Sequence, residues 1–479
     1  MNPEFLRRLK ALLSSDAVLT QPVERMVYEC DAYTVEKAQP DVVTLPSSTD
    51  DVAGIVRLCR EYAVPFLARG AGTGLSGGAL ALGGTVIIAM ARMNKVLSVD
   101  AANRRARVQA GIVNTHVSRA VEAFGLHFAP DPSSQSASTI GGNIAENAGG
   151  PHTLKYGVTS NHILAAEIVT PDGDVIEVGS PVEDAPGLDL LGVIVGSEGT
   201  FGIITEATLR LTPIAPAWRT LLATFDTVDD ATNTVSGIIA EGILPAALEM
   251  MDAVIIQSVE AAFHLGFPLD AAAVLLVELD GHAAGLDADA ARCLAVCEAH
   301  HARKVDMART EEERAALWKA RKKGVGTLGR ISRSMVTQDC VIPRSKLPVV
   351  LASISEIVAR HGLRVANIFH AGDGNLHPIV LFDERIPDEV ERMVAAGHEI
   401  ISLCLGVGGS ITGEHGVGVE KQDFLALQFS EADLDTMRRL HDALDPDDFC
   451  NPGKVFPGAK GCSRGCTHEI KLRQKAAAV

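Results

Sequence analysis

Two histidines and a Glu-His pair are the residues of this sequence best suited to chemistry. His370 and His377 lie in the run 368–381, which the residue pattern predicts to be a strand, a Gly-Asp-Gly turn and a second strand. Histidines opposite each other in such a hairpin have Cβ atoms about 4.5 to 5.5 Å apart, close enough to share a divalent metal. The alternative is two hydrogen-bonded or surface histidines without metal.

A second candidate lies on the glycine-flanked stretch Thr-Gly-Glu-His-Gly at 412–416. Its carboxylate, Glu414, could ligate a metal, and its neighbour His415 could take a proton from a substrate near neutral pH. The alternative for this pair is a solvated loop.

Glycine-rich segments at 69–79, 130–150 and 196–204 indicate a large bound group. Small residues after a strand let backbone N–H groups converge on a phosphate, and two such segments suit a diphosphate. The first segment contains the GxGxxG spacing, but Gly83-Gly84 and a strand follow it, so the dinucleotide fold that needs a long helix here is excluded. The alternative is a set of tight turns.

Composition excludes several classes of protein. The 479 residues carry 43 Lys and Arg against 60 Asp and Glu, and the net charge of −17 disfavours a nucleic-acid partner. No apolar run reaches 18 residues, so we expect no membrane span. The first residues lack the features of a signal peptide, and nine scattered cysteines fit a reducing compartment, so the expected location is the cytoplasm.

The pattern of elements predicts an α+β protein with a boundary at 213–218, where two prolines interrupt the periodicity. A helix is expected at 50–62 and another near 115–124. Beyond the boundary, the pattern predicts a helix through 250–262, among other elements. Expected strands in the first part lie at 64–68, 85–90, 96–99, 105–110, 164–169, 175–178 and 202–211.

Several of these segments together resemble a known family. The quoted stretches are 28–31, 69–80, 129–156, 248–252, 329–332, 365–377 and 408–418. In this order they resemble the FAD-linked oxidoreductases of the vanillyl-alcohol oxidase fold, in the branch that holds D-lactate and D-2-hydroxyglutarate dehydrogenases and the glycolate oxidase flavin subunit.

The resemblance implies a domain plan. We expect an FAD-binding domain of that type at 1–215, an α+β substrate or cap domain at 216–420, a segment returning to the FAD domain at 421–457 and a loose tail at 458–479. It also implies noncovalent FAD, because the first glycine loop lacks the histidine that covalent relatives often carry. The implied FAD contacts are Arg69, Gly70, Ala71, Gly72, Thr73, Gly74, Leu75, Ser76, Pro130, Asp131, Thr139, Gly141, Gly142, Asn143, Ala145, Ala148, Gly149, Glu198, Ile203, Ile204 and Asn451.

The resemblance also assigns roles to the candidate chemical residues. It implies that His370, His377 and Glu414 hold a divalent metal, Zn or Mn, at which a 2-hydroxy acid would bind, and that His415 is the catalytic base. Arg321 matches the family's arginine motif and is the implied clamp for the substrate carboxylate. Neighbouring basic residues that compete for this role are Lys322, Lys323, Arg330 and Arg333.

The implied function is oxidation of glycolate or a closely related D-2-hydroxy acid to the 2-oxo acid. The implied partners are a second FAD-domain-like subunit and an iron–sulfur subunit, with peripheral association to the inner membrane through them. The alternatives are a stand-alone D-lactate or D-2-hydroxyglutarate dehydrogenase, a metal-dependent hydrolase with structural glycine loops, and a scaffold subunit that binds FAD without catalysis. In the tail, Cys462, Cys466 and His468 have spacings that fit neither a zinc nor an iron–sulfur site.

Overall fold

A computed structural model describes residues 1–182 and 186–457, and their contacts divide the chain into two compact units. Unit 1 consists of Met1–Gly149, Val158–Ile214 and the described part of the chain from Glu414, which ends at residue 457. Unit 2 consists of Gly150–Gly157 and Ala215–Gly413. The return to unit 1 thus starts before the residue 421 expected from the sequence. The cysteines and histidine of the tail lie outside the described residues.

Unit 1 begins with a four-stranded sheet in the order β1-β2-β4-β3, in which β4 runs parallel to β2 and β3. The helix that precedes β3 shows why the sequence folds this way. Ser48 caps its first turn by accepting a hydrogen bond from Asp51 N at 3.1 Å, and the apolar stripe from Val52 to Cys59 is buried. The elements are α1 (Pro3–Leu12), β1 (Val18–Leu19), α2 (Pro22–Met26), β2 (Val42–Thr44), α3 (Thr49–Glu61), β3 (Phe66–Arg69) and β4 (Val86–Ala89).

The second sheet of unit 1 has five antiparallel strands in the order β5-β6-β10-β8-β9. One core cluster contains side chains of both sheets and of α1, including Phe5 and Leu9. The elements are β5 (Val96–Asp100), β6 (Arg105–Gln109), α4 (Asn114–Val121), β7 (Leu126–His127), α5 (Ile140–Glu146), β8 (Ile163–Val169), β9 (Val175–Gly179), α7 (Leu190–Ile194), β10 (Ile203–Arg210), β11 (Thr212–Pro213), α14 (Leu425–Gln428) and α15 (Glu431–Leu444). The strands expected in this part are confirmed, with ends shifted by one or two residues.

Unit 2 is built on one large antiparallel sheet, in the order β15-β12-β14-β13-β18-β19-β17, with β20 paired to β18 and β16 paired to β20. Its central strands are apolar on both faces, which is the pattern of a sheet covered on both sides. The strands are β12 (Ala217–Phe225), β13 (Ala247–Asp252), β14 (Ala273–Gly281), β15 (Lys304–Met307), β16 (Ser334–Thr337), β17 (Cys340–Val341), β18 (Arg364–His370), β19 (Asn375–Leu376) and β20 (Pro378–Phe382).

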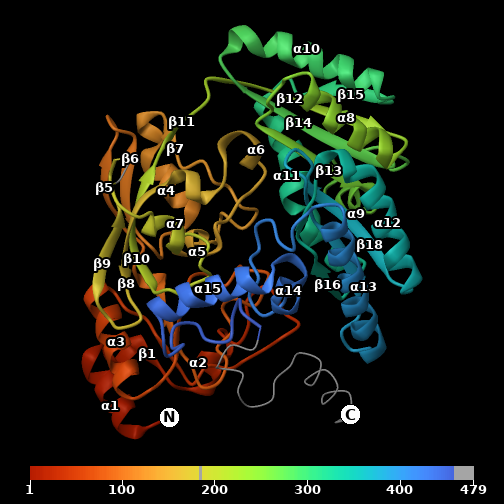
Figure 1. The fold of residues 1–479 in the computed structure, drawn as a ribbon. Coiled ribbons are helices and arrows are strands. Elements are labelled where there is room, and N and C mark those ends of the chain that lie inside the picture. Colours follow the sequence, from red (N-terminus) through yellow and green to blue (C-terminus); the bar gives the residue numbers. More distant parts are fainter. Residues whose placement is uncertain (183–185, 458–479) are drawn as a thin grey trace. The chain divides into compact units, whose positions relative to one another are not determined.

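Helices cover this sheet on both faces (Figure 1). Apolar side chains of α9 and α11 pack on the face that carries Met251 and Ile368, while α8, α10 and α12 lie against the other face. The helices are α6 (Thr153–Tyr156), α8 (Val228–Ala240), α9 (Ala253–Phe263), α10 (Ala283–Ala299), α11 (Glu311–Thr327), α12 (Leu347–Arg360) and α13 (Pro387–Gly406).

The helix expected through 250–262 is wrong at its start. Met250 and Met251 belong to β13, where they pair with β14 and β18, and the helix begins only at Ala253. The boundary is set by Asp252, whose Oδ1 accepts a hydrogen bond from Ile255 N at 3.0 Å as the helix cap. A short apolar run fits a buried strand as well as a buried helix, so periodicity alone did not separate them.

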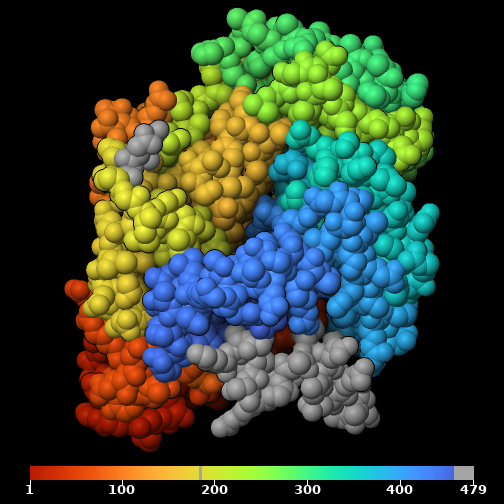
Figure 2. Space-filling view, in the orientation of Figure 1, coloured from red at the N-terminus to blue at the C-terminus, as the bar shows by residue number. Residues whose placement is uncertain are grey.

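Helix α10 lies at the molecular surface, where Figure 2 shows it in green. Its exposed positions carry mainly alanines, together with charged residues such as Asp287 and Arg292. Among the described residues, no helix combines the length and the apolar character that crossing a bilayer requires.

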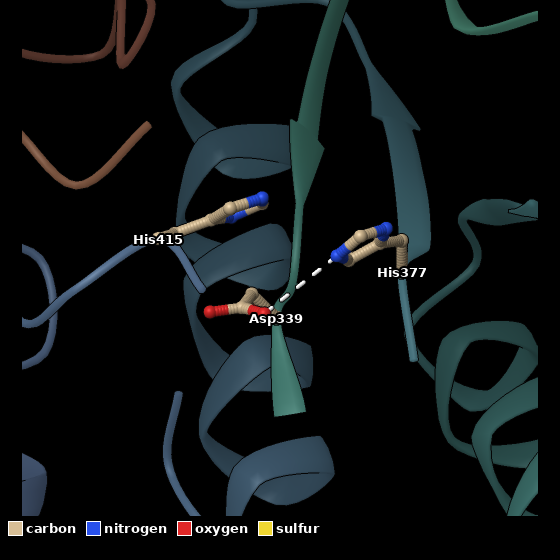
Figure 3. Close-up of side chains that lie close together, drawn as sticks. All are labelled: Asp339, His377 and His415. Atoms are coloured by element: carbon tan, nitrogen blue, oxygen red, sulfur yellow. Dashed lines mark ion pairs between the residues drawn. The ribbon is translucent and has the colours of Figure 1, made fainter. Parts of the chain in front are cut away.

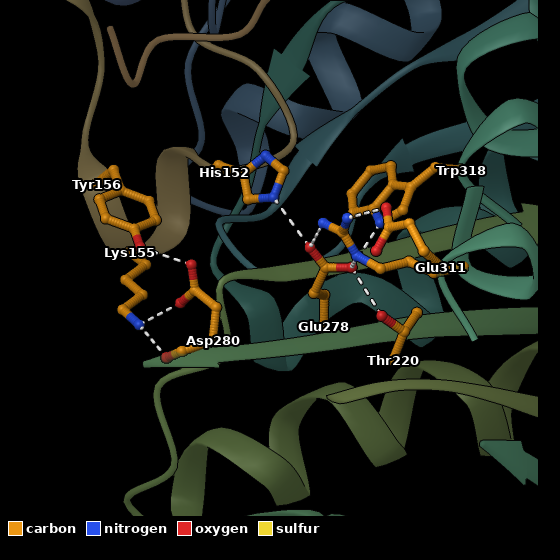
Figure 4. Close-up of polar contacts among 9 residues, drawn as sticks. His152, Lys155, Tyr156, Thr220, Glu278, Asp280, Glu311 and Trp318 are labelled. Atoms are coloured by element: carbon orange, nitrogen blue, oxygen red, sulfur yellow. Dashed lines mark hydrogen bonds and ion pairs between the residues drawn. The ribbon is translucent and has the colours of Figure 1, made fainter. Parts of the chain in front are cut away.

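A buried carboxylate organises one face of the sheet in unit 2 (Figure 4). Glu278 of β14 accepts hydrogen bonds from Arg314 at 2.7 and 2.9 Å, from Trp318 Nε1 at 2.6 Å and from Thr220 Oγ1 at 2.8 Å. His152 stacks on the Trp318 ring and lies 3.6 Å from the same carboxylate. Burial would raise the pKa of Glu278, but His152, Arg314 and Trp318 together hold this pKa well below its usual range.

The segment 150–157, which leaves unit 1 and returns to it, is fixed on this same face. Tyr156 OH donates to Asp280 Oδ2 at 2.6 Å, and Lys155 Nζ donates to the Asp280 carbonyl oxygen at 2.6 Å. Together with the stacked His152, these bonds hold the segment at the C-terminal end of β14. The short segment is therefore part of the packing of unit 2 although its neighbours in sequence belong to unit 1.

We predict that Glu278→Gln destabilises the protein at pH 7 by about 3 kcal/mol, because Arg314 loses its buried anionic partner. A carboxyl with a lowered folded-state pKa stabilises the protein above its unfolded pKa of about 4.3, and this contribution is lost as the pH falls below that value. Thermal unfolding midpoints measured from pH 7 to pH 2 should therefore differ by a constant amount down to about pH 4 and approach each other only below it.

The matched control is Asp287→Asn, which breaks the ion pair of Asp287 with Arg219 on the same sheet. Because Asp287 is 77% exposed, we expect its loss to change the midpoint very little. A Glu278 variant as stable as the control variant at pH 7 would contradict the prediction.

Candidate functional site

The three glycine-rich loops of unit 1 lie against one another. A Cβ placed on Gly70 in the first loop would collide with Thr139 Oγ1 in the second. The second and third loops are joined by backbone hydrogen bonds, from Gly196 N to Ile144 O at 2.9 Å and from Glu198 N to the Ala145 carbonyl at 2.8 Å. Segments far apart in sequence therefore form one glycine-lined region.

The returning chain after 414 ties these loops together. Glu198 accepts hydrogen bonds from Val417 N at 2.7 Å and from Gly418 N at 2.6 Å. Asn451 Nδ2 donates to the carbonyl oxygens of Gly78, at 3.0 Å, and of Glu198, at 2.8 Å. Asn451 thus links the first loop to the third.

Burial and proximity set the charges in this region. Burial raises the pKa of Glu146 well above its usual range, and the nearby Glu198 carboxylate raises it further. Burial also raises the pKa of Glu198, against the opposing effect of its two backbone donors. Lys454, which donates to the Leu80 carbonyl at 2.8 Å, has its pKa lowered to about 8 by burial. The loops therefore enclose a poorly solvated environment.

Several of the residues expected to contact FAD carry buried polar atoms without a hydrogen-bond partner among the described residues. These atoms are Arg69 Nη1, Ser76 Oγ and Asn143 Nδ2, and Ser138 Oγ, next to the expected Thr139, is a fourth. All four can donate hydrogen bonds, which is the chemistry that phosphate oxygens require. Buried polar groups without partners are rare in folded proteins, so these four donors indicate a binding region for an anionic group. A fifth such atom on the loops, Glu146 Oε2, belongs to a carboxyl whose raised pKa favours its neutral form.

The other expected FAD contacts are distributed over the same loops. Pro130 accepts a hydrogen bond from Asn114 Nδ2 at 2.9 Å, while Ile203 and Ile204 open β10 beside the third loop. Thr139 caps α5, the helix that starts at the second loop, by accepting from Gly142 N at 3.3 Å.

In unit 2 the candidate chemistry is centred on a carboxylate that the sequence analysis did not single out. Glu249 of β13 is fully buried, and both of its oxygens lie near His370 Nδ1, at 2.9 and 3.0 Å. Arg321 of α11 donates from Nε to the same carboxylate and is itself 3% exposed. The cross-strand pairing of Glu249 with His370 places both side chains on one face of the sheet.

This arrangement assigns the tautomer of His370. A carboxylate accepts hydrogen bonds and never donates them when ionised, so His370 Nδ1 carries the proton and donates it to Glu249. Arg321 Nη2 also approaches Nδ1, at 3.3 Å, but a protonated nitrogen cannot accept from it. The Nε2 atom of His370 therefore keeps its lone pair.

The hairpin that carries the two histidines is confirmed, but its register differs from the expectation. His370 pairs across the turn with Asn375, and Asn367 pairs with Pro378, so His377 falls between β19 and β20. The imidazole rings of His370 and His377 are nevertheless 5.2 Å apart at their centroids, in an edge-to-face arrangement. The tight turn, rather than direct pairing of the two histidines, brings them together.

Asp339 is a second buried carboxylate beside this hairpin. Its Oδ1 lies 3.6 Å from His377 Nε2, and Figure 3 shows the two side chains directed towards each other. Its Oδ2 accepts hydrogen bonds from Thr412 Oγ1 at 2.6 Å and from Gly413 N at 2.9 Å. Asp339 therefore fixes the chain immediately before Glu414 and His415, which are the first residues of the returning segment of unit 1.

Sequence reasoning missed Glu249 and Asp339 as members of this cluster. Glu249 is the single charged residue in the run Ala-Ala-Leu-Glu-Met-Met at 246–251. A lone carboxylate inside an apolar strand is costly to bury unless it has partners, and that was the available signal. Asp339 gave a weaker signal in the sequence, because only the fold brings it close to His377.

Comparisons with known proteins identify the families that match each part of the chain. The family described as "FAD binding domain" matches residues 40–179, and the family described as "FAD linked oxidases, C-terminal domain" matches residues 215–455. The chain is 45% identical to the glycolate oxidase subunit GlcD of Escherichia coli strain K12, over 94% of this chain and 91% of that protein. It is 30% identical to a D-lactate dehydrogenase of Anaerostipes hadrus, over 95% of this chain and 98% of that protein.

A solved structure shares the fold. The structure of p-cresol methylhydroxylase aligns with a TM-score of 0.78 at 18% sequence identity, covering 94% of this chain and 96% of that chain. The expected vanillyl-alcohol oxidase-type fold is confirmed, and the FAD-binding match disfavours a hydrolase with merely structural glycine loops. The chain belongs to the FAD-linked oxidase family that includes glycolate oxidase subunit GlcD and D-lactate dehydrogenase, and it is an FAD-linked oxidoreductase.

Proposed function

We propose that this protein oxidises glycolate, or a closely related D-2-hydroxy acid, to the corresponding 2-oxo acid. The observation that carries the proposal is the buried cluster in unit 2, where one carboxylate, Glu249, holds both His370 and Arg321. Such a cluster offers an imidazole and a guanidinium in a place where an acid substrate can be recognised. The 45% identity to glycolate oxidase subunit GlcD supports glycolate as the first substrate to test.

FAD fits the glycine-rich loops of unit 1. The buried donors Arg69 Nη1, Ser76 Oγ and Asn143 Nδ2 would bind its pyrophosphate oxygens, together with backbone N–H groups of the first two loops. The remaining expected contacts, from Pro130 to Gly149 and at Glu198, Ile203, Ile204 and Asn451, would surround the flavin and the adenine. Binding is noncovalent in this proposal, because the first loop contains no histidine.

The donor set at the histidine hairpin fits a divalent metal. Metal-binding histidines usually donate their other ring N–H to a carboxylate, which is the relation of His370 to Glu249. We propose His370, His377 and Glu414 as ligands, since Glu414 directly follows Gly413, which Asp339 holds beside His377. Two imidazoles and a carboxylate suit Zn or Mn.

Different residues of the chain would then bind the substrate and take its proton. Arg321 would orient the substrate carboxylate with its Nη groups, since its Nε is used by Glu249. His415 would take the proton of the substrate hydroxyl at an imidazole nitrogen. When bound, the metal would make this hydroxyl more acidic and FAD would supply the acceptor of the hydride.

Further features of the proposal concern partners and location. The E. coli relative is named as a subunit of glycolate oxidase, which supports partner subunits for this chain as well. We propose that electrons leave the flavin through an FAD-domain-like subunit and an iron–sulfur subunit, with attachment to the inner membrane through these partners. A stand-alone D-lactate or D-2-hydroxyglutarate dehydrogenase is the second candidate, supported by the D-lactate dehydrogenase relative.

The first prediction from this function concerns the flavin spectrum of the purified protein loaded with FAD and Zn or Mn under anaerobic conditions. We expect glycolate to bleach the flavin bands faster than D-lactate or D-2-hydroxyglutarate, because the metal and Arg321 recognise the hydroxy-acid group. Stopped-flow absorbance with each acid measures the rates. Faster bleaching by D-lactate or D-2-hydroxyglutarate would establish the second candidate. If no acid bleaches the flavin, the proposed oxidation is overturned, and the result is that expected for an FAD-binding scaffold subunit.

The variant His415→Ala serves as the control for the base. It should retain the oxidised flavin spectrum but lose reduction by at least about 100-fold, the usual contribution of a general base. Reduction at the normal rate in this variant would remove His415 from that role.

The second prediction concerns FAD affinity. Asn143→Ala removes a buried donor, and a hydrogen bond to a charged group contributes about 1.5–3 kcal/mol, so the dissociation constant of FAD should rise about 10- to 100-fold. Fluorescence quenching of FAD titrated with the apoprotein measures it. Asn103→Ala, in the exposed β5–β6 turn of the same unit, is the matched control and should leave the constant unchanged.

The third prediction concerns the metal at the hairpin. His370→Ala should lose one equivalent of bound metal and the flavin reduction together, while FAD stays bound, because His370 lies in unit 2 and the FAD loops in unit 1. Metal analysis of dialysed protein and its visible spectrum provide the readouts. His361→Ala, whose imidazole pairs with Glu399 on the surface of the same unit, should retain both properties. Unchanged metal content in His370→Ala would contradict the ligand assignment.

A further inference from the structure

A second set of metal-binding side chains lies in unit 1, at the end of α15. His441 of this helix and Asp445 and Asp448 of the following turn each offer one ligand atom, and these atoms all lie within 4.8 Å of one another. Helix α15 lies at the molecular surface, where Figure 2 shows it in blue. None of the three residues takes part in the proposed reaction.

The buried carboxylate of Asp445 is incompletely satisfied. The residue is fully buried, and its Oδ2 accepts a hydrogen bond from Cys450 N at 2.7 Å. Its Oδ1 accepts none within the part of the chain that the structure describes. Burial correspondingly raises the pKa of Asp445 above its usual range. A buried carboxylate oxygen without a donor is costly, and a bound cation is one of the few groups that remove this cost.

The spacing of His441 and Asp448 suits two ligands of one ion. His441 Nε2 lies 3.7 Å from Asp448 Oδ1, which is too long for a hydrogen bond. Two ligands on a tetrahedral Zn²⁺, with bonds of about 2.0–2.2 Å, lie about 3.3–3.6 Å apart. A small adjustment of either side chain would therefore complete the geometry.

The surroundings of His441 hold its ring in place. The imidazole packs against Phe201 and Phe456, with centroids 5.9 and 5.7 Å away. Its other nitrogen, Nδ1, lies 3.6 Å from Asp442 Oδ1, a carboxylate in the position from which outer partners commonly orient a ligating histidine. A buried imidazole whose orientation is fixed is a better metal ligand than a mobile surface histidine.

A protein cation near Asp445 does not replace the ion. The charge of Arg60 acts on this carboxylate, but the guanidinium makes its ion pairs elsewhere, with Asp172 and Asp447 at 3.0 Å each. The electrostatic pull on a divalent cation therefore persists, with two carboxylates facing one imidazole.

We propose that His441, Asp445 and Asp448 form a structural Zn²⁺ site, with water as the fourth ligand. The ion would stabilise the turn that leads from α15 to Cys450 and Asn451. Because Asn451 bonds to both Gly78 and Glu198, the ion would stabilise the segment that joins the first and third glycine loops. The site is separate from the histidine hairpin of unit 2 and does not depend on the proposed reaction.

The test is Zn²⁺ binding to the metal-stripped, FAD-loaded full chain, measured by isothermal titration and by metal analysis after dialysis. We expect two equivalents in the wild type, one in His441→Gln, one in Asp448→Asn, one in His377→Ala and none in His377→Ala/His441→Gln. Zn²⁺ should also raise the thermal midpoint of His377→Ala but not that of the double variant. Asp435→Asn, which breaks the exposed ion pair of Asp435 with Arg439 on the same helix, is the matched control and should keep two equivalents.

The outcomes separate this site from the metal of the proposed reaction. If that metal is absent, the wild type and His377→Ala both bind one equivalent, and His441→Gln binds none. The proposal is overturned if His441→Gln and Asp448→Asn both bind Zn²⁺ as the wild type does. Circular dichroism and the flavin spectrum verify that each variant is folded, and glycolate should reduce the flavin of His441→Gln at the wild-type rate.

Discussion

Glycine-rich loops have few side chains with which to pack, so other parts of unit 1 must hold them in place. Here the constraint is met by polar groups from the end of the chain. Glu198 receives two backbone N–H groups of 417–418, and Asn451 bonds to carbonyl oxygens of the first and third loops. Because these groups are buried, each unmade bond would cost about 1–3 kcal/mol. The loops therefore keep their close approach without bulky side chains that would occupy the space of a cofactor.

In unit 2, buried carboxylates on one face of the sheet hold other polar side chains in place. Glu249 holds a histidine and an arginine, and Glu278 holds an arginine, a tryptophan and a threonine. Each carboxylate is buried among apolar residues of its strand, so each charge depends on the partners around it. Glu249 holds its partners at the candidate site, and Glu278 holds its partners where the segment 150–157 is anchored.

The sequence predicted local features well and long-range contacts poorly. Helix α3 was predicted from its cap and its apolar stripe, and the strands of the second sheet were predicted from short apolar runs between glycines. The start of α9 was missed, because Met250 and Met251 are buried on both sides of a strand and show no period. The register of the histidine hairpin was missed as well, because the turn geometry at 371–374 decides it rather than residue type.

The candidate site shows the same division. The glycine loops and His370, His377 and Arg321 were predicted from motifs and resemblance, and the structure places the last three in one unit. Glu249 and Asp339 were not predicted as their partners, because pairing between β13 and β18, and the loop at 412–413, exist only in the folded chain. A motif identifies the reactive groups, whereas the groups that orient them come from elsewhere in the fold.

The insertion of unit 2 between two parts of unit 1 has a consequence for biosynthesis. Residues 215–413 can form most of their contacts as soon as they leave the ribosome, since their sheet is continuous in sequence. Unit 1 must wait, because Val417, Gly418 and Asn451 are synthesised more than 200 residues after Glu198 or the loops before it. Contacts of such long sequence separation form late. The bonds from 417–418 and Asn451 to the first and third loops are therefore the last to form, and the glycine-lined region reaches its final arrangement only when residues 417–451 have been synthesised.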